Sequence, residues 1–416
     1  MGVRDYAGMV KEVFSNRNIL AISLTTSIFS LTSGWNPFWA KYMQENLGAT
    51  MVIIGIFSMI SSAENLIFQL PGGMLADRFG RKKIIIYGTF LRTFSPIIYF
   101  AAPSWEWLIP ATFLNGMTSL YMPAFSAIVA DSLPGKRRGA GYGAYSMITS
   151  LPNMVSPLIG GYVMEAYGYR DGVRMFLAVS VVVNLLVTAM RWRILEETVD
   201  STPKSKEMSF LPRRAIFSDL PKSIRVMSIV AIIGSFSSRL IMDFTNLYAL
   251  DILNIAPSQL GLITCLVSGL SAMLALPGGM LSDRYGRKNN IMLGRVVAPI
   301  SQGLISISSG YENYFAVRMF NGAAIAIGGS GMEAGGPSWN ALIADILPPE
   351  KRATVFGTIG TLTAVVASPS SILGGWLWQN VSPQLPFQAS MVIGLVSAAI
   401  FWVGVNEPAK DEKPPV

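Results

Sequence analysis

Apolar runs of about 20 residues recur along the whole chain, and short charged or glycine- and proline-containing segments separate them. A helix of about 20 apolar residues is long enough to cross a hydrocarbon core roughly 30 Å thick. The pattern therefore predicts an all-α membrane protein with twelve transmembrane helices. We expect them at residues 18–43, 50–76, 83–102, 105–131, 139–166, 172–193, 222–250, 257–282, 289–309, 312–345, 352–378 and 386–405.

One long polar segment interrupts this pattern between the sixth and seventh predicted helices. It contains the run ETVDSTPKSKEMSFLPRRAIFSDLPK, whose composition is typical of a linker. The sequence thus predicts an N-terminal six-helix bundle (1–193), a cytoplasmic linker (194–221) and a C-terminal six-helix bundle (222–416). The composition agrees, because only 13% of the residues are charged, against about 25% in soluble domains.

The distribution of Lys and Arg predicts the orientation in the membrane. With the N-terminus inside, 25 of the 32 basic residues lie in cytoplasmic segments and three (Lys41, Arg170 and Arg174) lie outside. Cytoplasmic loops are the ones enriched in Lys and Arg, so we expect both termini inside a multi-pass protein of the cell membrane. The net charge of +8 then reflects topology and contact with the lipid bilayer, and no nucleic-acid partner is expected.

The sequence lacks the residues on which several other classes of protein function depend. There is no histidine, and Cys265, the single cysteine, lies in an apolar run, so neither a metal site nor an enzyme's catalytic constellation is expected. The Gly135-Lys136 pair is followed by Arg instead of the Ser or Thr of a phosphate-binding loop. The first seventeen residues have no apolar core, which argues against a cleavable signal peptide. We expect no cofactor and no enzymatic activity.

The two halves repeat each other. PGGMLADRFGRKK (71–83) returns as PGGMLSDRYGRK (277–288), 206 residues later, and Asn115-Gly116 returns as Asn321-Gly322 at the same offset. PAFSAIVAD (123–131) then matches PSWNALIAD (337–345) at an offset of 214, because the second half has eight extra residues within GGSGMEAGG (328–336). Repeats in the same orientation are what transporters use to build two halves around a central site.

The segment from Gly73 to Lys82 resembles the loop signature G-x-L-x-D-R-x-G-R-K of the major facilitator superfamily, and Gly279 to Lys288 resembles a second copy of it. With the twelve predicted helices and the long linker, the resemblance covers essentially the whole chain. It implies the fold of that superfamily and a secondary transporter that works by alternating access.

The resemblance also implies a cytoplasmic gate. Asp77 would face the start of the predicted helix near Arg352, and Asp283 the start of the helix near Gly139, where a carboxylate is stabilised by the helix dipole. Contacts that exist only while one side is closed bias a two-state equilibrium. The alternative to a gate is that these are only basic cytoplasmic loops, each with a counter-charge. The implied gate residues, including the pairs Arg81–Asp131 and Arg287–Asp345, are Gly73, Asp77, Arg78, Gly80, Arg81, Asp131, Gly279, Asp283, Arg284, Gly286, Arg287 and Asp345.

Ionisable residues inside the predicted helices are candidates for ion coupling and substrate binding, because such groups are costly at membrane depth. Glu333 is the leading coupling candidate, since Gly and Pro residues around it weaken the helix and irregular backbone at depth is tolerated where it lines a cavity. Glu64 and Arg92 lie at similar depths and are candidates for an ion pair, either working or structural.

Three further arginines and one aspartate complete this set. Arg239 and Asp243, four residues apart, meet on one helix face as an outer gate or a self-neutralised pair. Arg318 precedes Gly322 with the arginine-to-glycine spacing that proton-coupled members of the family have in helix 4, where this chain has Thr112 instead. Arg295 is expected to extend toward the membrane surface.

Aromatic residues supply candidates for the cavity wall. Trp35, Asn36, Phe38 and Trp39 surround Pro37 in the first predicted helix, which should be kinked there. An interfacial aromatic belt explains the tryptophans equally well. Trp339, with Tyr121 and Trp376, is a similar candidate.

The predicted fifth helix resembles the pattern G-x8-G-x3-G-P-x2-G-G of drug–proton antiporters. Gly143, Pro157, Gly160 and Gly161 match it, whereas Pro152 and Ser156 depart from it; close helix packing is the alternative explanation. The resemblance favours a monomeric, proton-coupled exporter of small amphipathic or drug-like compounds, since carboxylates within the membrane can take up and release protons. The alternatives are sodium as the coupling ion, a proton-coupled importer of a small metabolite or sugar, and a transport-inactive sensor.

Overall fold

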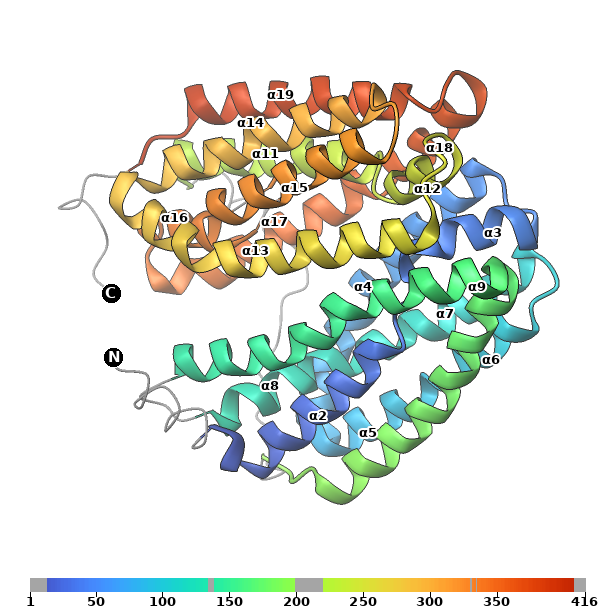
Figure 1. The fold of residues 1–416 in the computed structure, drawn as a ribbon. Coiled ribbons are helices and arrows are strands. Elements are labelled where there is room, and N and C mark those ends of the chain that lie inside the picture. Colours follow the sequence, from blue (N-terminus) through green and yellow to red (C-terminus); the bar gives the residue numbers. More distant parts are fainter. Residues whose placement is uncertain (1–12, 134–137, 199–219, 330, 334, 408–416) are drawn as a thin grey trace. The chain divides into compact units, whose positions relative to one another are not determined.

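A computed structural model describes residues 13–133, 138–198, 220–329, 331–333 and 335–407 of the 416-residue chain (Figure 1). These residues are mostly α-helical, and no β-strand occurs among them. They fall into two compact units, the first formed by Met1–Gly48 with Ile60–Lys206 and the second by Ala49–Met59 with Glu207–Val416.

The first unit is built from the helices before the polar segment, except for the first residues of α4, which belong to the second unit. Its elements are α2 (Arg17–Leu31), η1 (Asn36–Phe38), α3 (Trp39–Leu47), α4 (Met51–Phe79), α5 (Arg81–Leu91), α6 (Phe94–Ala101), η2 (Trp105–Trp107), α7 (Leu108–Met117), η3 (Thr118–Tyr121), α8 (Met122–Ser132) and α9 (Arg138–Ile194).

The second unit consists of the first residues of α4 and the helices that follow the polar segment. Its elements are α11 (Lys222–Arg239), α12 (Phe244–Asp251), α13 (Pro257–Tyr285), α14 (Arg287–Ser306), α15 (Tyr311–Gly328), α16 (Pro337–Ile346), α17 (Pro349–Ala367), α18 (Ser370–Asn380) and α19 (Leu385–Gly404). Within this unit α14 packs against both α15 and α19, and α11 packs against α19 (Figure 1).

Many helix ends lie within a few residues of their predicted positions, but several predicted helices are interrupted. The first breaks into α2 and α3 around Pro37, as expected, because proline cannot donate a backbone hydrogen bond. The prediction of one continuous helix was wrong for 312–345, which ends at Gly328 and resumes at Pro337. Conversely, α9 runs through two predicted helices that meet at Gly168, where φ is +75°.

Seven segments of the described chain are long and apolar enough to cross a membrane. They are Arg81–Ala101, Trp105–Ser132, Gly143–Ile194, Lys222–Asp251, Pro257–Tyr285, Thr354–Asn380 and Leu385–Gly404. The third of these contains 52 residues and therefore includes two of the predicted crossings.

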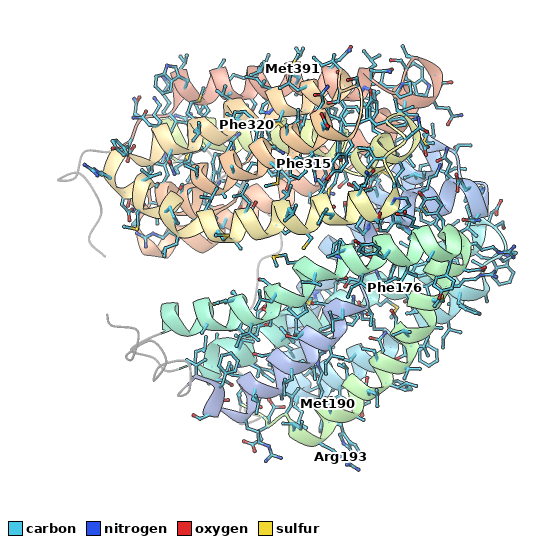
Figure 2. The ribbon with its side chains drawn as sticks, in the orientation of Figure 1. Phe176, Met190, Arg193, Phe315, Phe320 and Met391 are labelled. Atoms are coloured by element: carbon cyan, nitrogen blue, oxygen red, sulfur yellow. The ribbon has the colours of Figure 1, made fainter. Side chains whose placement is uncertain are left out.

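The same close helix contact occurs in both units. A Cβ atom at Gly160 of α9 would lie 2.6 Å from the carbonyl carbon of Gly34, and one at Gly374 of α18 would lie 2.9 Å from that of Leu240. Gly34 itself packs against Phe176, labelled in Figure 2. Glycine is required at these positions because the backbones approach too closely for any side chain.

The hydrophobic cores also repeat. One cluster in the first unit and one in the second contain residues at matching positions of the repeat. The matching pairs are Ile85 and Ile291, Ile128 and Leu342, Leu133 and Leu347, and Leu195 and Val405. Each core lies beside the repeated charged loop of its own unit and holds the helices that carry the loop.

Candidate functional site

The repeated loops adopt the same backbone conformation. Gly80, between α4 and α5, and Gly286, between α13 and α14, both have a φ of +93°. This conformation is rarely open to a residue with a side chain. The glycine of each signature is therefore required by the turn that joins its two helices.

Both ion pairs implied by the family resemblance are present. Arg81 Nη1 contacts Asp131 Oδ2 in the first unit, and Arg287 Nη1 lies 2.8 Å from Asp345 Oδ2 in the second. Each pair joins the loop of its unit to the end of α8 or α16. The pairs are formed within one unit, so they are part of how each loop is positioned.

Two glutamates that the sequence analysis missed complete these loops. The carboxylate of Glu197 accepts hydrogen bonds from the backbone N–H groups of Arg81 at 3.1 Å and Lys82 at 3.0 Å. Glu407 does the same for Arg287 at 2.9 Å and Lys288 at 3.0 Å. The first N–H groups of a helix have no partner within it, and here a carboxylate supplies one. The signal in the sequence was a glutamate repeated at an offset of 210 residues.

The remaining implied gate contacts stay predictions. Asp77 lies in α4, but its side chain is outside the described residues, and Asp283 is exposed at the end of α13. Arg352, near the start of α17, donates to the backbone oxygens of Ala344 at 2.7 Å and Leu347 at 2.9 Å. It thereby binds the carbonyl end of α16.

The interruption between α15 and α16 contains Glu333. Gly329, Gly335 and Gly336 there have φ values of +61°, +128° and +90°, which allow the chain to leave the helical path. The segment lines a cavity of about 450 Å³ within the second unit. Most of the wall is apolar or glycine, and Glu333 is the charged residue among those that line it, with Gln302 and Ser238 as polar neighbours. The expectation of irregular backbone around Glu333 is confirmed.

Two side chains of α14 hold this irregular segment. Asn290 Nδ2 donates to the backbone oxygen of Ile327 at 2.7 Å, just before the break. Arg295, 1% exposed, donates to the backbone oxygens of Met332 at 3.2 Å and Glu333 at 3.5 Å. The prediction that Arg295 extends to the membrane surface was wrong, because these carbonyl groups and two aromatic rings surround it.

The rings beside Arg295 are those of Trp339 and Phe401. Its guanidinium carbon lies 4.5 Å from the centre of the Trp339 ring and 5.4 Å from that of Phe401, and the two rings stack at 6.0 Å. Trp339 is 1% exposed, so it belongs to the core and does not line a cavity as predicted. Trp376 is 49% exposed, and its role in a cavity wall stays a prediction.

The first unit places a guanidinium in the equivalent position, but from another helix. Arg191 of α9 lies with its guanidinium carbon 5.3 Å from the Phe125 ring centre, and its Nη1 donates to Thr89 Oγ1 at 2.7 Å. The repeat offsets of 206, 214 and 210 residues make Thr89, Phe125 and Arg191 the counterparts of Arg295, Trp339 and Phe401. The arginine thus comes from α9 in the first unit and from α14 in the second.

Glu64 lies buried in α4 at 5% exposure. A Cβ atom at Gly116 would lie 2.5 Å from the Glu64 Cβ, so this glycine makes room for the glutamate. Glu64 Oε1 has no hydrogen-bond partner among the described residues. The pairing considered for Glu64 and Arg92 does not form, because Arg92 instead covers the Phe29 ring at 3.8 Å and donates to the Tyr121 hydroxyl at 3.1 Å.

The other predicted charges lie in the second unit. Asp243 interacts electrostatically with Arg239 and accepts a hydrogen bond from Ser58, so the two members of the expected pair do lie near each other. Arg318 is half-buried, with its guanidinium carbon 6.0 Å from the centre of the Tyr314 ring. Arg239, Asp243 and Arg318 are all absent from the lining of the cavity that contains Glu333.

The aromatic group of the first helix forms a packed cluster. Trp35 and Trp39 meet edge to face with ring centres 4.8 Å apart, and Trp39 also contacts Tyr99 at 5.1 Å. Phe38 is fully buried, whereas Asn36 is exposed. The structure brings these residues together around the break, and their role as a cavity wall stays a prediction.

The glycines of the helix-5 pattern separate into two kinds. Gly160 is required for close packing, as described above, and Gly161 is buried beside it. A Cβ atom at Gly143 would meet nothing within 4 Å, and Pro157 lies inside α9. Packing therefore explains Gly160 and gives no account of Gly143.

Two helical units with the same charged loop, each closed by its own ion pair and glutamate, define a duplicated helical membrane protein. The sequence model of the family named Major Facilitator Superfamily matches residues 20–252 and 227–416 of this chain. The chain belongs to this superfamily, and it is a multi-pass membrane transporter with the twelve-helix fold.

Similar proteins agree with this assignment. An uncharacterized MFS-type transporter of Methanocaldococcus jannaschii is 25% identical, with 92% of this chain and 97% of that protein covered. The multi-drug resistance efflux pump PmrA of Streptococcus pneumoniae is 25% identical over 67% of this chain and 69% of its own length. A Na(+), Li(+), K(+)/H(+) antiporter of Planococcus maritimus is 30% identical over 44% of this chain and 43% of its own length.

The fold is also that of solved transporters. The crystal structure of the nucleoside transporter NupG superposes with a TM-score of 0.70 at 16% identity, covering 92% of this chain and 98% of that one. At this identity the similarity concerns the fold alone.

Proposed function

We propose that this transporter exports small amphipathic, preferably cationic compounds in exchange for protons, by alternating access and as a monomer. The observation that carries the proposal is Glu333, the charged residue lining a cavity of about 450 Å³ in the second unit. Cavities of roughly 300–1,000 Å³ with apolar walls and few polar groups are typical of sites for drug-sized ligands.

The chemistry of this wall favours a cation over an anion. Among the described residues that line it, there is one carboxylate and no lysine or arginine. A positively charged substrate and a proton can compete for a single carboxylate, and such competition couples the two movements in opposite directions. The similarity to a multi-drug efflux pump and to a cation/proton antiporter supports the same direction and coupling.

Glu64 is a second candidate for the proton pathway. It is buried and lacks a partner for Oε1 among the described residues, and intramembrane carboxylates often belong to ion or proton pathways. We assign the charged loops to the gate, with Asp77 and Asp283 biasing the closed state on the side that we predict to be cytoplasmic. Both termini lie on that side in this proposal.

Purified protein in liposomes with an imposed pH gradient tests the function. Lipophilic cations, organic anions and sugars are added in turn while a dye reports the internal pH. We expect lipophilic cations to dissipate the gradient and to accumulate against their own gradient. Movement of a sugar together with protons would replace export by import. If no compound moved protons but a sodium gradient drove transport, sodium would be the coupling ion.

A further inference from the structure

The first unit contains a smaller cavity, of about 170 Å³, that the proposed transport cycle does not use. Residues of α2, α5, η3, α8 and α9 line it. Its polar wall consists of Thr26, Thr89, Arg92, Tyr121, Asn184 and Arg191. It therefore lies inside one bundle and holds two arginines.

Hydrogen bonds fix both guanidinium groups at this wall. Arg191, 4% exposed, donates from Nε to Thr25 Oγ1 at 3.2 Å and from Nη1 to Thr89 Oγ1 at 2.7 Å. Arg92 donates from Nη1 to the Tyr121 hydroxyl at 3.1 Å. Arg191 also forms a side-chain hydrogen bond with Tyr121. Both guanidinium groups thus lie beside the same tyrosine hydroxyl group.

No described carboxylate forms an ion pair with Arg92 or Arg191. Three acidic groups of this unit are engaged elsewhere: Glu196 pairs with Arg17, Glu197 binds the start of α5, and Asp131 pairs with Arg81. Glu64 does not line this cavity. A buried charge is costly unless a counter-charge or hydrogen bonds compensate it. Arg295 in the second unit binds two backbone carbonyl groups, whereas the partners of Arg191 are hydroxyl groups.

Two further polar groups at the wall lack partners. Asn184 is 1% exposed, and its Oδ1 has no hydrogen bond among the described residues. Thr26 Oγ1 likewise has no hydrogen bond among the described residues. Buried polar groups in native proteins usually bind another group or an ordered water molecule. The cavity therefore combines excess positive charge with unused hydrogen-bonding capacity.

We infer that this cavity binds one small free anion with its hydration water, held by Arg92 and Arg191. A volume of about 170 Å³ corresponds to roughly six water molecules at about 30 Å³ each. It admits chloride, nitrate or acetate but excludes gluconate and drug-sized compounds. The anion supplies the missing counter-charge, and its water satisfies Asn184 and Thr26. The site goes beyond the proposed function and is independent of Glu333.

Thermal unfolding of the purified, delipidated full-length protein tests this inference. Intrinsic tryptophan fluorescence is followed in sodium chloride, nitrate, acetate or gluconate at constant sodium concentration and ionic strength. A ligand that binds the native state raises the Tm in a saturable way. We expect saturable rises with chloride, nitrate or acetate and none with gluconate.

Variants locate the response. Arg92→Gln removes one guanidinium at a half-buried position and is expected to raise the apparent Kd at least tenfold. Thr26→Val, which removes a wall hydroxyl, is expected to raise it about threefold. Arg170→Gln, at an exposed position of the same unit, serves as the matched control and is expected to leave the Kd unchanged.

Three outcomes would overturn the inference. The first is an equal rise with gluconate, which would indicate a general salt effect. The second is an unchanged chloride response in Arg92→Gln and Thr26→Val. The third is a response to added phosphatidylglycerol with none to the free anions, which would make the ligand a lipid headgroup.

Discussion

The Glu407 carboxylate accepts a hydrogen bond from the backbone N–H of Arg287 at 2.9 Å and so joins the segment after α19 to the start of α14. Glu197 makes the equivalent bond to Arg81 in the first unit. Each glutamate lies near the positive end of a helix dipole, where a carboxylate contributes about 0.3–1 kcal/mol, and up to ~2 kcal/mol when partly buried. The loop signature therefore depends on a residue more than 110 positions away.

Glu407→Gln is expected to lower the free energy of unfolding by about 1 kcal/mol, because the amide has no charge to interact with the helix dipole. Glu197→Gln should have a smaller effect, since Glu197 is exposed and Glu407 is half-buried. The Tm of the purified variants measures both changes. Glu196→Gln, which removes an exposed ion pair with Arg17, is the control and should have the weakest effect of the three.

Glu333→Gln is expected to abolish uphill transport driven by a pH gradient while sparing exchange of substrate for substrate. The amide fills the same space but cannot exchange a proton with the cavity. Counterflow and gradient-driven transport are compared in the same liposome preparation. Glu312→Gln, in the first turn of α15, is the control. Intact uphill transport in Glu333→Gln would remove this residue from the coupling mechanism.

Arg295→Gln is expected to release the segment between α15 and α16. The change removes hydrogen bonds from a charged donor to the backbone oxygens of Met332 and Glu333, and such bonds contribute about 1.5–3 kcal/mol each. Hydrogen–deuterium exchange of peptides covering 331–336 should increase. Arg295→Lys keeps the charge but lacks the planar group that stacks on Trp339. The exchange of these peptides in Arg295→Lys should therefore lie between that of the wild type and that of Arg295→Gln. Unchanged exchange in Arg295→Gln would contradict the assigned contacts.

Gly160→Ala is expected to destabilise the protein by about 1–3 kcal/mol, the usual cost of overpacking. The new methyl group would meet the backbone of Gly34. Gly143→Ala is the matched control, since a Cβ atom there meets nothing within 4 Å and alanine favours the helix over glycine. Tm values and folded yield after size-exclusion chromatography measure both. Equal effects of Gly160→Ala and Gly143→Ala would show that the close packing at Gly160 does not determine the stability of the protein.

Asp77→Asn is expected to lower the turnover rate more than it weakens substrate binding, because the proposed gate acts on the conformational equilibrium and does not touch substrate. Transport rates in liposomes and equilibrium binding of the same substrate in detergent separate the two quantities. Asp283→Asn should behave alike in the second unit. An unchanged turnover rate in both variants would falsify the gate assignment.

Much of the fold was predictable because helix length and loop charge are local properties of the sequence. The segment Pro257–Tyr285 forms a helix that starts at the predicted residue. The repeated glycines were also informative, since Gly80 and Gly286 each have a positive φ. The interruption at 329–336 was only half predicted: the glycines indicated a weakened helix, but its extent depends on Asn290 and Arg295, which lie on another helix.

The candidate site was less predictable because its contacts join distant helices. Arg191 is among the 25 basic residues that the sequence assigns to cytoplasmic segments. In the structure it is only 4% exposed. Arg92 and Glu64 were natural partners by depth, and only the structure shows that Arg92 turns to Phe29 and Tyr121. Depth can be read from position along a helix, but the direction of a side chain around it depends on neighbours.

The placement of Arg191 and Arg295 at non-matching positions of the two halves has an evolutionary consequence. If the two halves descend from one duplicated ancestor, the arginine has since moved from one helix to its neighbour while the place it occupies was kept. A residue-by-residue alignment of the halves scores Thr89 against Arg295 and Arg191 against Phe401 as unrelated. A search for this feature in other chains therefore has to accept an arginine beside the aromatic ring from either helix.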